Sequence, residues 1–315
     1  MILAAGFGTR LRPLTDELPK PLIPVANRPL LAWCLDRLQA AGVRRVVINL
    51  HHLADAIPAA LGDGSAWGLR IHWSPEEAIL GTGGGLVRAR EALGGGPFFL
   101  LNGDVLSAVD LEALLDCHRR RGAAATMVVR PLPAGADFTP LGCDAAGRLV
   151  AFKGIERPAR GAVRPCMFCG VHVLEPAVFD HLPASGFACV NDRGYAGMLR
   201  AGLEVGAYWY TGPWFDLGTP ARYLAASAAV LEGRARLPGF TPPAGGVLVD
   251  RGAAVAASAA LRGPLAVGAG CRIEPNAAAA DAVLWPGARL AAGERLRAAV
   301  LTPHHRVARK NESEP

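Results

Sequence analysis

The chain has 315 residues, of which 51% are hydrophobic, with a formal net charge of +6 and a pI near 9.2. This length and apolar content can bury a full core, and the glycines and prolines are spread between apolar runs, which argues against disorder. The basic balance favours anionic partners. However, no run of basic residues is long enough for a nucleic-acid tract, and small phosphorylated substrates fit the charge as well.

In the first hundred residues, short apolar runs alternate with amphipathic stretches. These segments are residues 1–5, 30–41, 46–50, 53–61, 69–73, 86–93 and 98–101. The alternation predicts an α/β fold, a mostly parallel sheet with helices on both faces, whose strand ends at the ligand crevice carry the chemistry. After a further helix at 111–121, strand candidates at 125–130, 148–152 and 168–174 predict a substrate lobe inserted into the same domain.

From about Gly245, aliphatic residues recur every six positions. They are Val249, Val255, Leu261, Val267 and Ile273, followed after an offset by Leu284, Leu290 and Leu296. This period fits neither an α-helix nor a simple strand, but it suits a left-handed β-helix of hexapeptide repeats, and low charge disfavours a disordered Ala/Gly-rich tail. We therefore expect an α/β domain over residues 1–235, a β-helix over 245–302 and a disordered tail over 303–315.

A glycine-rich loop, Leu3-Ala-Ala-Gly-Phe-Gly-Thr-Arg-Leu-Arg-Pro-Leu, follows the first predicted strand. Gly6 and Gly8 let the backbone approach a ligand closely, which is typical of a phosphate-binding loop. A dinucleotide-binding fingerprint would need a third glycine where Leu11 stands, and Pro13 opposes an immediate helix start. The loop therefore predicts phosphate binding and disfavours a Rossmann dehydrogenase.

Two basic residues accompany this loop. Arg10 can bridge phosphate oxygens through its planar guanidinium, and Lys20, between two prolines, can place a point charge on a phosphate. Only three of the 33 basic residues are lysines, so Lys20 stands out. A plain turn rich in glycine and proline would explain neither residue.

The sequence shows no targeting signal, and its cysteines do not suggest a disulfide framework or a metal site. The N-terminus lacks a basic leader, and no apolar stretch reaches membrane-spanning length, which predicts a cytoplasmic protein without membrane contact. Seven scattered cysteines fit buried thiols in a reducing compartment. Cys166 and Cys169 form a C-x-x-C, but without a second pair or nearby histidines a zinc or redox site is disfavoured.

The loop, with Pro19-Lys-Pro-Leu and Pro24-Val, resembles the signature of the sugar-1-phosphate nucleotidylyltransferases. The resemblance continues through Gly81-Thr-Gly-Gly-Gly-Leu, Asn102-Gly-Asp104, Phe168-Cys-Gly-Val-His-Val-Leu and Trp214-Phe-Asp-Leu-Gly-Thr-Pro220, in the family's order. It implies a Rossmann-like, GT-A-like mixed sheet. It also implies an enzyme in which a sugar phosphate oxygen attacks the α-phosphorus of a nucleotide, with pyrophosphate leaving and Mg²⁺ spreading the charge.

The resemblance assigns roles on the nucleotide side. The implied catalytic residues are Arg10, Lys20 and Asp104. Two carboxylates facing a triphosphate imply a hard cation, and the resemblance makes Asp104 and Asp216 its ligands. The implied nucleotide-binding residues are Ala4, Ala5, Gly6, Gly8, Thr9, Arg10, Lys20, Glu76, Gly81, Thr82 and Asn102. We expect the base and ribose to lie against the bare backbone of Gly83–Gly85, the alternative being a tight strand-to-helix turn.

The sugar side follows the family less closely. The resemblance implies sugar or sugar-phosphate contacts by Gly142, Glu156, Arg157 and Gly170, with Arg157 in place of the family's lysine. Lys153 competes with Arg157 for the phosphate. Asn191 is a further candidate for the sugar.

The sequence leaves alternatives for the base of the nucleotide and for the sugar 1-phosphate. Glu76 or Glu77 could accept from guanine, and this stretch resembles the mannose-1-phosphate guanylyltransferases. Ile48-Asn-Leu-His-His, Gly62-Asp-Gly-Ser and Ser74-Pro-Glu instead resemble the N-acetylmuramate-1-phosphate uridylyltransferases, which generally lack the repeats. We therefore favour GTP and mannose 1-phosphate, with heptose 1-phosphate as a further alternative. The repeats predict oligomerisation or ligand sensing, and a non-catalytic regulatory subunit is an alternative class.

Overall fold

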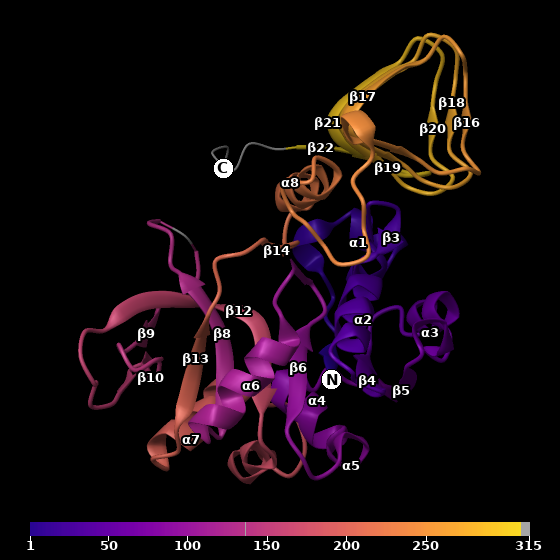
Figure 1. The fold of residues 1–315 in the computed structure, drawn as a ribbon. Helices are drawn as coiled ribbons and strands as arrows, with labels where there is room; N and C mark the ends of the chain where they lie inside the picture. The colour runs from indigo at the N-terminus through magenta and orange to yellow at the C-terminus, as the bar shows by residue number, and fades with distance from the viewer. Residues whose placement is uncertain (136, 310–315) are drawn as a thin grey trace. The chain divides into compact units, whose positions relative to one another are not determined.

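The computed structural model describes residues 1–135 and 137–309, which form two compact units (Figure 1). Unit 1 consists of Met1–Gly6, Arg37–Val105 and Val109–Gly212. Unit 2 consists of Phe7–Asp36, Leu106–Ala108 and the chain from Pro213 onward. This division differs from the expected boundary near residue 235, because residues 7–36 and 213–235 pack with the C-terminal strands.

Within the described residues, unit 1 is built on a ten-stranded mixed sheet. Its strands are β1 (Ile2–Leu3), β4 (Arg45–Leu50), β5 (Arg70–Pro75), β6 (Phe98–Asn102), β8 (Ala125–Pro131), β9 (Leu141–Cys143), β10 (Leu149–Phe152), β11 (Ile155–Glu156), β12 (Arg164–Leu174) and β13 (Val205–Trp209). β6, β1, β4 and β5 lie side by side and pair in parallel. The predicted α/β fold is confirmed.

The parallel strands bring separate polar residues to one edge of the sheet. β4 and β6 are nearly continuous apolar runs, as expected for strands buried on both faces. Leu3 of β1 pairs with Asn49 on one side and Asn102 on the other. Asn49 in turn pairs with Ser74 of β5. The loops that follow these four strands therefore emerge together.

β12 joins the two halves of the sheet. It pairs antiparallel with β8 along one side, and with β9 and then β6 along the other. Its register shifts between Phe168 and His172, where Gly170 has a φ of 74°, a conformation that favours glycine. The strand-rich half therefore continues the same sheet.

Helices connect these strands. They are α2 (Leu30–Ala40), α3 (Ala56–Leu61), α4 (Gly81–Arg88), α5 (Arg90–Leu93), α6 (Leu111–Arg121), α7 (Ala196–Arg200) and the π-helical turn η5 (Val190–Tyr195). α6 has the predicted bounds, because the Asp110 carboxylate caps it at Ala113 N and Gly122 ends it in the left-handed region. The segment at 86–93 belongs to two helices, α4 and α5, and α4 begins at Gly81.

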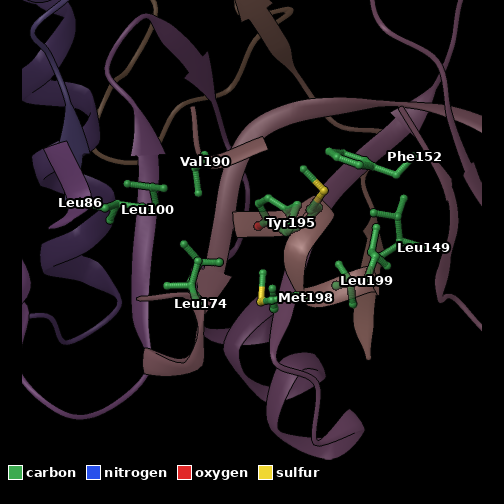
Figure 2. Packing of buried hydrophobic residues seen from close by; sticks show 14 of the residues in the cluster. Leu86, Leu100, Leu149, Phe152, Leu174, Val190, Tyr195, Met198 and Leu199 are labelled. Atoms are coloured by element: carbon green, nitrogen blue, oxygen red, sulfur yellow. The ribbon is translucent and has the colours of Figure 1, made fainter. Parts of the chain in front are cut away.

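The core of unit 1 lies between the sheet and these helical segments. Figure 2 shows strand side chains such as Leu100 and Phe152 gathered around Tyr195 and Met198. Tyr195 and Met198 are completely buried, and the Tyr195 ring centroid lies 6.0 Å from that of Phe152. The core therefore ties η5 and α7 to the sheet.

Unit 2 begins with short elements around the glycine-rich loop. They are η1 (Thr9–Leu11), α1 (Leu14–Glu17), η2 (Lys20–Leu22), β2 (Pro24–Val25) and β3 (Arg28–Pro29). β14 (Trp214–Asp216) pairs with β7 (Val105–Ser107) and leads into α8 (Pro220–Leu231). Thr219 caps α8 through its hydroxyl, and Pro220 occupies the first turn.

The C-terminal part of unit 2 is a stack of parallel strands. They are β15 (Val247–Val249), β16 (Ala254–Val255), β17 (Ala260–Val267), β18 (Arg272–Ile273), β19 (Ala278–Leu284), β20 (Arg289–Leu290) and β21 (Arg295–Leu301). Val249 pairs with Val267, 18 residues later, whereas Val267 pairs with Leu284, 17 residues later. The first offset is three times six residues, and the shorter second offset matches the break in the six-residue period of the sequence.

α8 packs against this stack along β17, β19 and β21 (Figure 1). Trp285 Nε1 donates to Tyr223 Oη at 3.1 Å, and Tyr223 Oη donates to the Pro24 carbonyl at 2.5 Å. Both rings are buried in one apolar cluster. These contacts explain why the helix belongs to the C-terminal unit.

The chain does not fray at residue 303 as expected. β22 (Arg306–Ala308) pairs antiparallel with β21, because Thr302 bonds with His305 and turns the chain back. Residues 310–315 of the predicted disordered tail lie outside the described residues. Over the described chain, no helix is long and apolar enough to cross a membrane.

Candidate active site

The predicted phosphate loop begins in unit 1 at the end of β1. Ala4 and Ala5 are buried, and Ala4 N donates to Asn49 Oδ1 at 2.8 Å. Gly6 is exposed, and a Cβ at this position would meet no atom within 4 Å. The unit boundary falls directly after Gly6. The loop backbone is therefore anchored on β4 before it becomes exposed.

The rest of the loop belongs to unit 2 and surrounds Gly8. Gly8 has a φ of 64°, and its carbonyl accepts from Thr15 Oγ1 at 3.0 Å. A Cβ on Gly8 would lie 2.8 Å from Thr15 Cγ2 and 3.2 Å from Lys20 Cβ. The missing side chain thus lets buried Lys20 pack against the loop, while Thr9 and Arg10 are exposed.

Asp216, one of the two predicted metal ligands, lies at the end of β14 in unit 2. Its Oδ2 accepts from Arg222 Nη1 at 2.9 Å. A Cβ on Gly218 would lie 3.1 Å from Asp216 Oδ2 and 3.1 Å from Arg10 Nη2. Gly218 therefore leaves space for the Asp216 carboxylate and the Arg10 guanidinium on the same side of the turn.

Asn102 and Asp104 occupy the end of β6 and the turn after it, in unit 1. Gly103 N donates to the Leu3 carbonyl at 2.9 Å, and a Cβ on Gly103 would lie 2.7 Å from that oxygen. A Cβ on Gly170 would lie 3.1 Å from Asn102 Cβ. The structure thus places Gly170 of β12 against Asn102 at the end of β6.

Glu76 is held by the protein on both of its carboxylate oxygens. Oε1 accepts from Asn49 Nδ2 at 2.7 Å, and Oε2 accepts from Leu80 N at 2.9 Å. The residue is only 5% exposed. Glu76 therefore shapes the 76–80 loop through its side chain, whereas the neighbouring Glu77 is exposed.

Other parts of the chain lie against Gly83–Gly85 on the side where each would carry a Cβ. A Cβ on Gly84 would lie 2.3 Å from the Gly186 carbonyl, and one on Gly83 would lie 3.1 Å from Val190 N. Gly83 N also donates to the Ala188 carbonyl at 2.8 Å. Gly83 and Gly84 therefore allow helix α4 to pack closely against the 186–190 segment.

Gly81 and Thr82 meet the same segment. Val190 N donates to Thr82 Oγ1 at 2.8 Å. A Cβ on Gly81, whose φ is 69°, would lie 2.6 Å from the Ala188 carbonyl and 2.9 Å from the Phe187 ring. Phe187 is 70% exposed. An exposed aromatic ring therefore covers the start of α4, and no motif in the sequence pointed to it.

The two candidate cations for the sugar phosphate have different partners. Lys153, at a tight turn with a φ of 47°, pairs with Asp192, which raises the pKa of the lysine. Its side chain is 37% exposed. Arg157 donates to the carbonyls of Leu203 at 2.5 Å and Gly202 at 2.9 Å. Arg157 thus holds the chain that follows α7, and Lys153 is the more accessible of the two.

The other predicted sugar contacts are in the same half of unit 1. Gly142 lies on β9, where a Cβ would come within 2.7 Å of Ala151 Cβ. Glu156 is exposed on β11. Asn191 belongs to η5, and within the described residues its buried Oδ1 has no hydrogen-bond partner. An unpartnered buried acceptor in a π-helical turn is a typical feature of a ligand site.

Cys166 and Cys169 do not form a metal centre with other residues. Over the described chain, no three His, Cys, Asp or Glu side chains converge to hold a metal ion. Cys166 Sγ lies 3.1 Å from Cys143 Sγ, and burial raises the pKa of Cys169 to about 12. Both cysteines are core thiols of β12, as the sequence predicted.

Sequence reasoning missed two residues that hold predicted site residues, Asn49 and Arg222. Asn49 is a polar residue near the end of a buried apolar strand, which is the available signal. Arg222 lies in the first turn of α8 and gives no such signal, because only the fold brings it to Asp216.

Comparisons with known proteins identify the family of the chain. A family model described as nucleotidyl transferase matches residues 1–233. The chain is 36% identical over 295 residues to a mannose-1-phosphate guanylyltransferase of Mycobacterium tuberculosis, covering 93% of this chain and 81% of the relative. It is 39% identical over 236 residues to an N-acetylmuramate α-1-phosphate uridylyltransferase of Neisseria meningitidis, covering 72% of this chain and 96% of the relative.

Solved structures show the same fold. A Bacillus anthracis protein described as a glucose-1-phosphate thymidylyltransferase superposes with a TM-score of 0.63 at 20% identity, covering 76% of this chain and 96% of that one. HddC from Yersinia pseudotuberculosis, complexed with GMP-PN, gives a TM-score of 0.59, also at 20% identity, covering 72% and 96%.

Proposed function

Because the chain belongs to the nucleotidyl transferase family and is a sugar-1-phosphate nucleotidyltransferase, we propose that it joins GTP to mannose 1-phosphate and releases pyrophosphate. The supporting observation is the extent of similarity. Relatives named as mannose-1-phosphate guanylyltransferases match 79–93% of this chain, and four of them match 92–93%, a span that includes the C-terminal strands. The match to the N-acetylmuramate α-1-phosphate uridylyltransferase covers 72%, whereas a UTP–glucose-1-phosphate uridylyltransferase of Synechocystis covers 87% at 31% identity, below the 36% of the first guanylyltransferase.

The proposed nucleotide site uses the glycine-rich loop and the residues around it. Backbone groups of Ala5, Gly6, Gly8 and Thr9 would bind phosphate oxygens, with Ala4 anchoring the start of the loop through its bond to Asn49, and Arg10 and Lys20 would neutralise the phosphate charge. Gly81, Thr82 and Asn102 would contact the nucleoside. This reaction needs no protein nucleophile, since positioning and charge neutralisation can supply most of the acceleration.

Proteins of this family generally use a divalent metal ion, and we assign it to the carboxylates of Asp104 and Asp216 as Mg²⁺. Carboxylate oxygens are the donors that this hard cation prefers, so the residues fit the ion. Asp216 is already positioned by Arg222, and its side chain is only 14% exposed. Bound Mg²⁺ would stabilise the negative charge of the triphosphate and of the leaving pyrophosphate.

For the sugar phosphate we propose Lys153 as the cation, with Arg157 in a structural role. Lys153 is the more exposed, and its partner Asp192 adjoins Asn191, whose Oδ1 could accept from a sugar hydroxyl. Arg157 is engaged with two backbone carbonyls. Gly142, Glu156 and Gly170 would line the sugar.

A second candidate is the transfer of UMP from UTP to N-acetylmuramate 1-phosphate. It is favoured by the 39% identity over 236 residues, which exceeds the 36% identity to the guanylyltransferase. The buried Glu76 carboxylate also weakens the guanine assignment, which then depends on Glu77.

A substrate panel tests these proposals. Pyrophosphate release is measured with the four ribonucleoside triphosphates against the 1-phosphates of mannose, glucose, heptose and N-acetylmuramate. The highest kcat/KM with GTP and mannose 1-phosphate supports the first proposal, and the highest value with another pair replaces it. Binding of a nucleotide sugar without turnover of any pair would indicate a regulatory subunit.

For residues 245–302 we propose the left-handed β-helix of hexapeptide repeats. The 18-residue pairing offset, three times six, supports it. We further propose that these coils join copies of the chain. Light scattering of the whole protein tests this, because a monomeric mass at micromolar concentration would contradict it.

A further inference from the structure

Asn49 and Glu76 form a buried pair that links two loops. Asn49 Oδ1 accepts from Ala4 N at 2.8 Å, and Asn49 Nδ2 donates to Glu76 Oε1 at 2.7 Å. Glu76 Oε2 then accepts from Leu80 N at 2.9 Å. A continuous chain of hydrogen bonds thus runs from the phosphate loop at Ala4 to the end of the 76–80 loop. All four residues belong to unit 1.

The pair has little freedom to rearrange. Asn49 is 3% exposed and Glu76 is 5% exposed, so water cannot replace their bonds cheaply. The backbone of Glu76 is held as well, because its N donates to the Leu50 carbonyl at 2.7 Å and His51 Nδ1 lies 2.8 Å from its carbonyl oxygen. Movement of one loop therefore disturbs the other.

Helix α4 closes the third side of the pair. A Cβ on Gly85 would lie 2.8 Å from Glu76 Oε1 and 3.0 Å from Asn49 Nδ2. Only a glycine lets the α4 backbone approach these two side chains so closely. The start of α4, at Gly81 and Thr82, follows Leu80 directly. The pair is thus in contact with three segments that the proposed nucleotide site uses.

We propose that the Asn49–Glu76 pair couples the phosphate loop to the 76–82 segment, so that binding of the triphosphate and binding of the base favour each other. Asn49 and the Glu76 carboxylate are positioning residues and do not read the base. This inference rests on the proposed function, because it takes the triphosphate to lie at the first loop and the base at the second. Binding of the triphosphate shifts the Asn49–Glu76 pair toward the arrangement that suits binding of the base, and binding of the base likewise favours binding of the triphosphate.

The experiment measures this coupling by binding, without turnover. Calorimetry of the whole protein gives the Kd of a nucleoside, the best one from the substrate panel, with and without saturating tripolyphosphate. In the wild type we expect tripolyphosphate to tighten nucleoside binding about fivefold, the lower end of usual coupling. Glu76→Gln and Asn49→Ala should each reduce the ratio of the two nucleoside Kd values, without and with tripolyphosphate, to near one.

The two variants interrupt the chain of bonds at different points. Glu76→Gln is isosteric and can still accept from Asn49, but one of its two terminal atoms becomes an amide donor, so the bond from Leu80 N is lost. Asn49→Ala removes the bonds to both Ala4 and Glu76. If the pair acts as one unit, the double variant loses no more of the coupling than the single variant with the larger loss. Glu91→Gln, an exposed change on α5, is the matched control.

Three results would overturn the proposal. One is an unchanged ratio in folded Glu76→Gln. Another is additive losses in the double variant. The third is a change of base preference in Glu76→Gln that Asn49→Ala does not share, because this would make the carboxylate a direct reader of the base. If Asn49→Ala does not fold, the Glu76→Gln ratio decides alone. Failure of the proposed function appears separately, as absence of turnover in the wild-type panel.

Discussion

Arg222 Nη1 lies 2.9 Å from Asp216 Oδ2, so the carboxylate proposed to bind Mg²⁺ already faces a positive charge. The guanidinium is 32% exposed and the carboxylate 14%, which leaves their interaction partly screened. A divalent cation that binds Asp216 must share the carboxylate with Arg222 or displace it.

Arg222→Met should therefore strengthen metal binding. Loss of a neighbouring positive charge in a partly screened site changes affinity by about 1 kcal/mol, or roughly fivefold. Titration with Mn²⁺, followed by electron paramagnetic resonance, measures the Kd. Arg222→Lys keeps the charge and should remain close to the wild type. Weaker binding by Arg222→Met would instead mean that the arginine mainly holds Asp216 in place.

Asp104→Asn and Asp216→Asn should each lower kcat/KM by about a hundredfold or more, because each removes one negative ligand oxygen from the proposed metal site. Pyrophosphate release measured against Mg²⁺ concentration checks this result. Part of the loss should be recovered at high Mg²⁺. Near-normal turnover in both variants would exclude these residues as metal ligands.

Lys153→Ala should raise the KM for the sugar 1-phosphate about tenfold or more and leave the KM for the nucleotide unchanged, since a charge-assisted bond to phosphate is lost. Arg157→Ala is the matched comparison. It should lower the melting temperature, because the carbonyls of Gly202 and Leu203 lose their partner. The opposite pattern would make Arg157 the phosphate ligand.

Stability should fall in acid partly because of His172. Burial lowers the pKa of this histidine from 6.5 to about 3, so the unfolded chain binds a proton that the folded protein excludes between these two pH values. Its contribution is constant above pH 6.5 and decreases by about 1.4 kcal/mol per pH unit below it. Urea unfolding of His172→Gln between pH 4 and 7 should show a shallower loss than the wild type. If the unfolding free energies of the wild type and the variant fall in parallel as the pH is lowered, His172 does not cause the loss of stability in acid.

Trp285→Ala should destabilise unit 2 by about 3–5 kcal/mol, because it leaves a cavity in the cluster between α8 and the C-terminal strands. Trp285→Phe is the control. It keeps most of the apolar volume and loses the bond to Tyr223 Oη, which still donates to Pro24, so we expect a loss of about 1 kcal/mol. Chemical unfolding monitored by circular dichroism measures both values.

The sequence predicts best those features that depend on neighbouring residues. The helix at Leu111–Arg121 has its cap, its apolar face and its terminal glycine within one segment. The six-residue period beyond Gly245 agrees with the pairing of parallel strands 18 residues apart, three times six.

The candidate site shows where such reasoning fails. Gly83–Gly85 were expected to face a ligand, but a Cβ on Gly83 or Gly84 would meet the 186–190 segment, far away in the chain, and a Cβ on Gly85 would meet Glu76 and Asn49. A glycine allows close approach without indicating what approaches. Glu76 was expected to face the base, yet its carboxylate is bound by Asn49 and Leu80. Only the fold decides which partner a buried polar group finds.

The sequence by itself determined the α/β class, the order of most strands and helices, and the loop that marks the family, because periodicity and backbone conformation are local properties. The tertiary structure alone decided that Asn49 joins Ala4 to Glu76, that Arg222 holds Asp216, and that residues 7–36 pack with the C-terminal strands. These contacts depend on parallel strands ending at one edge and on burial that leaves each polar group few partners.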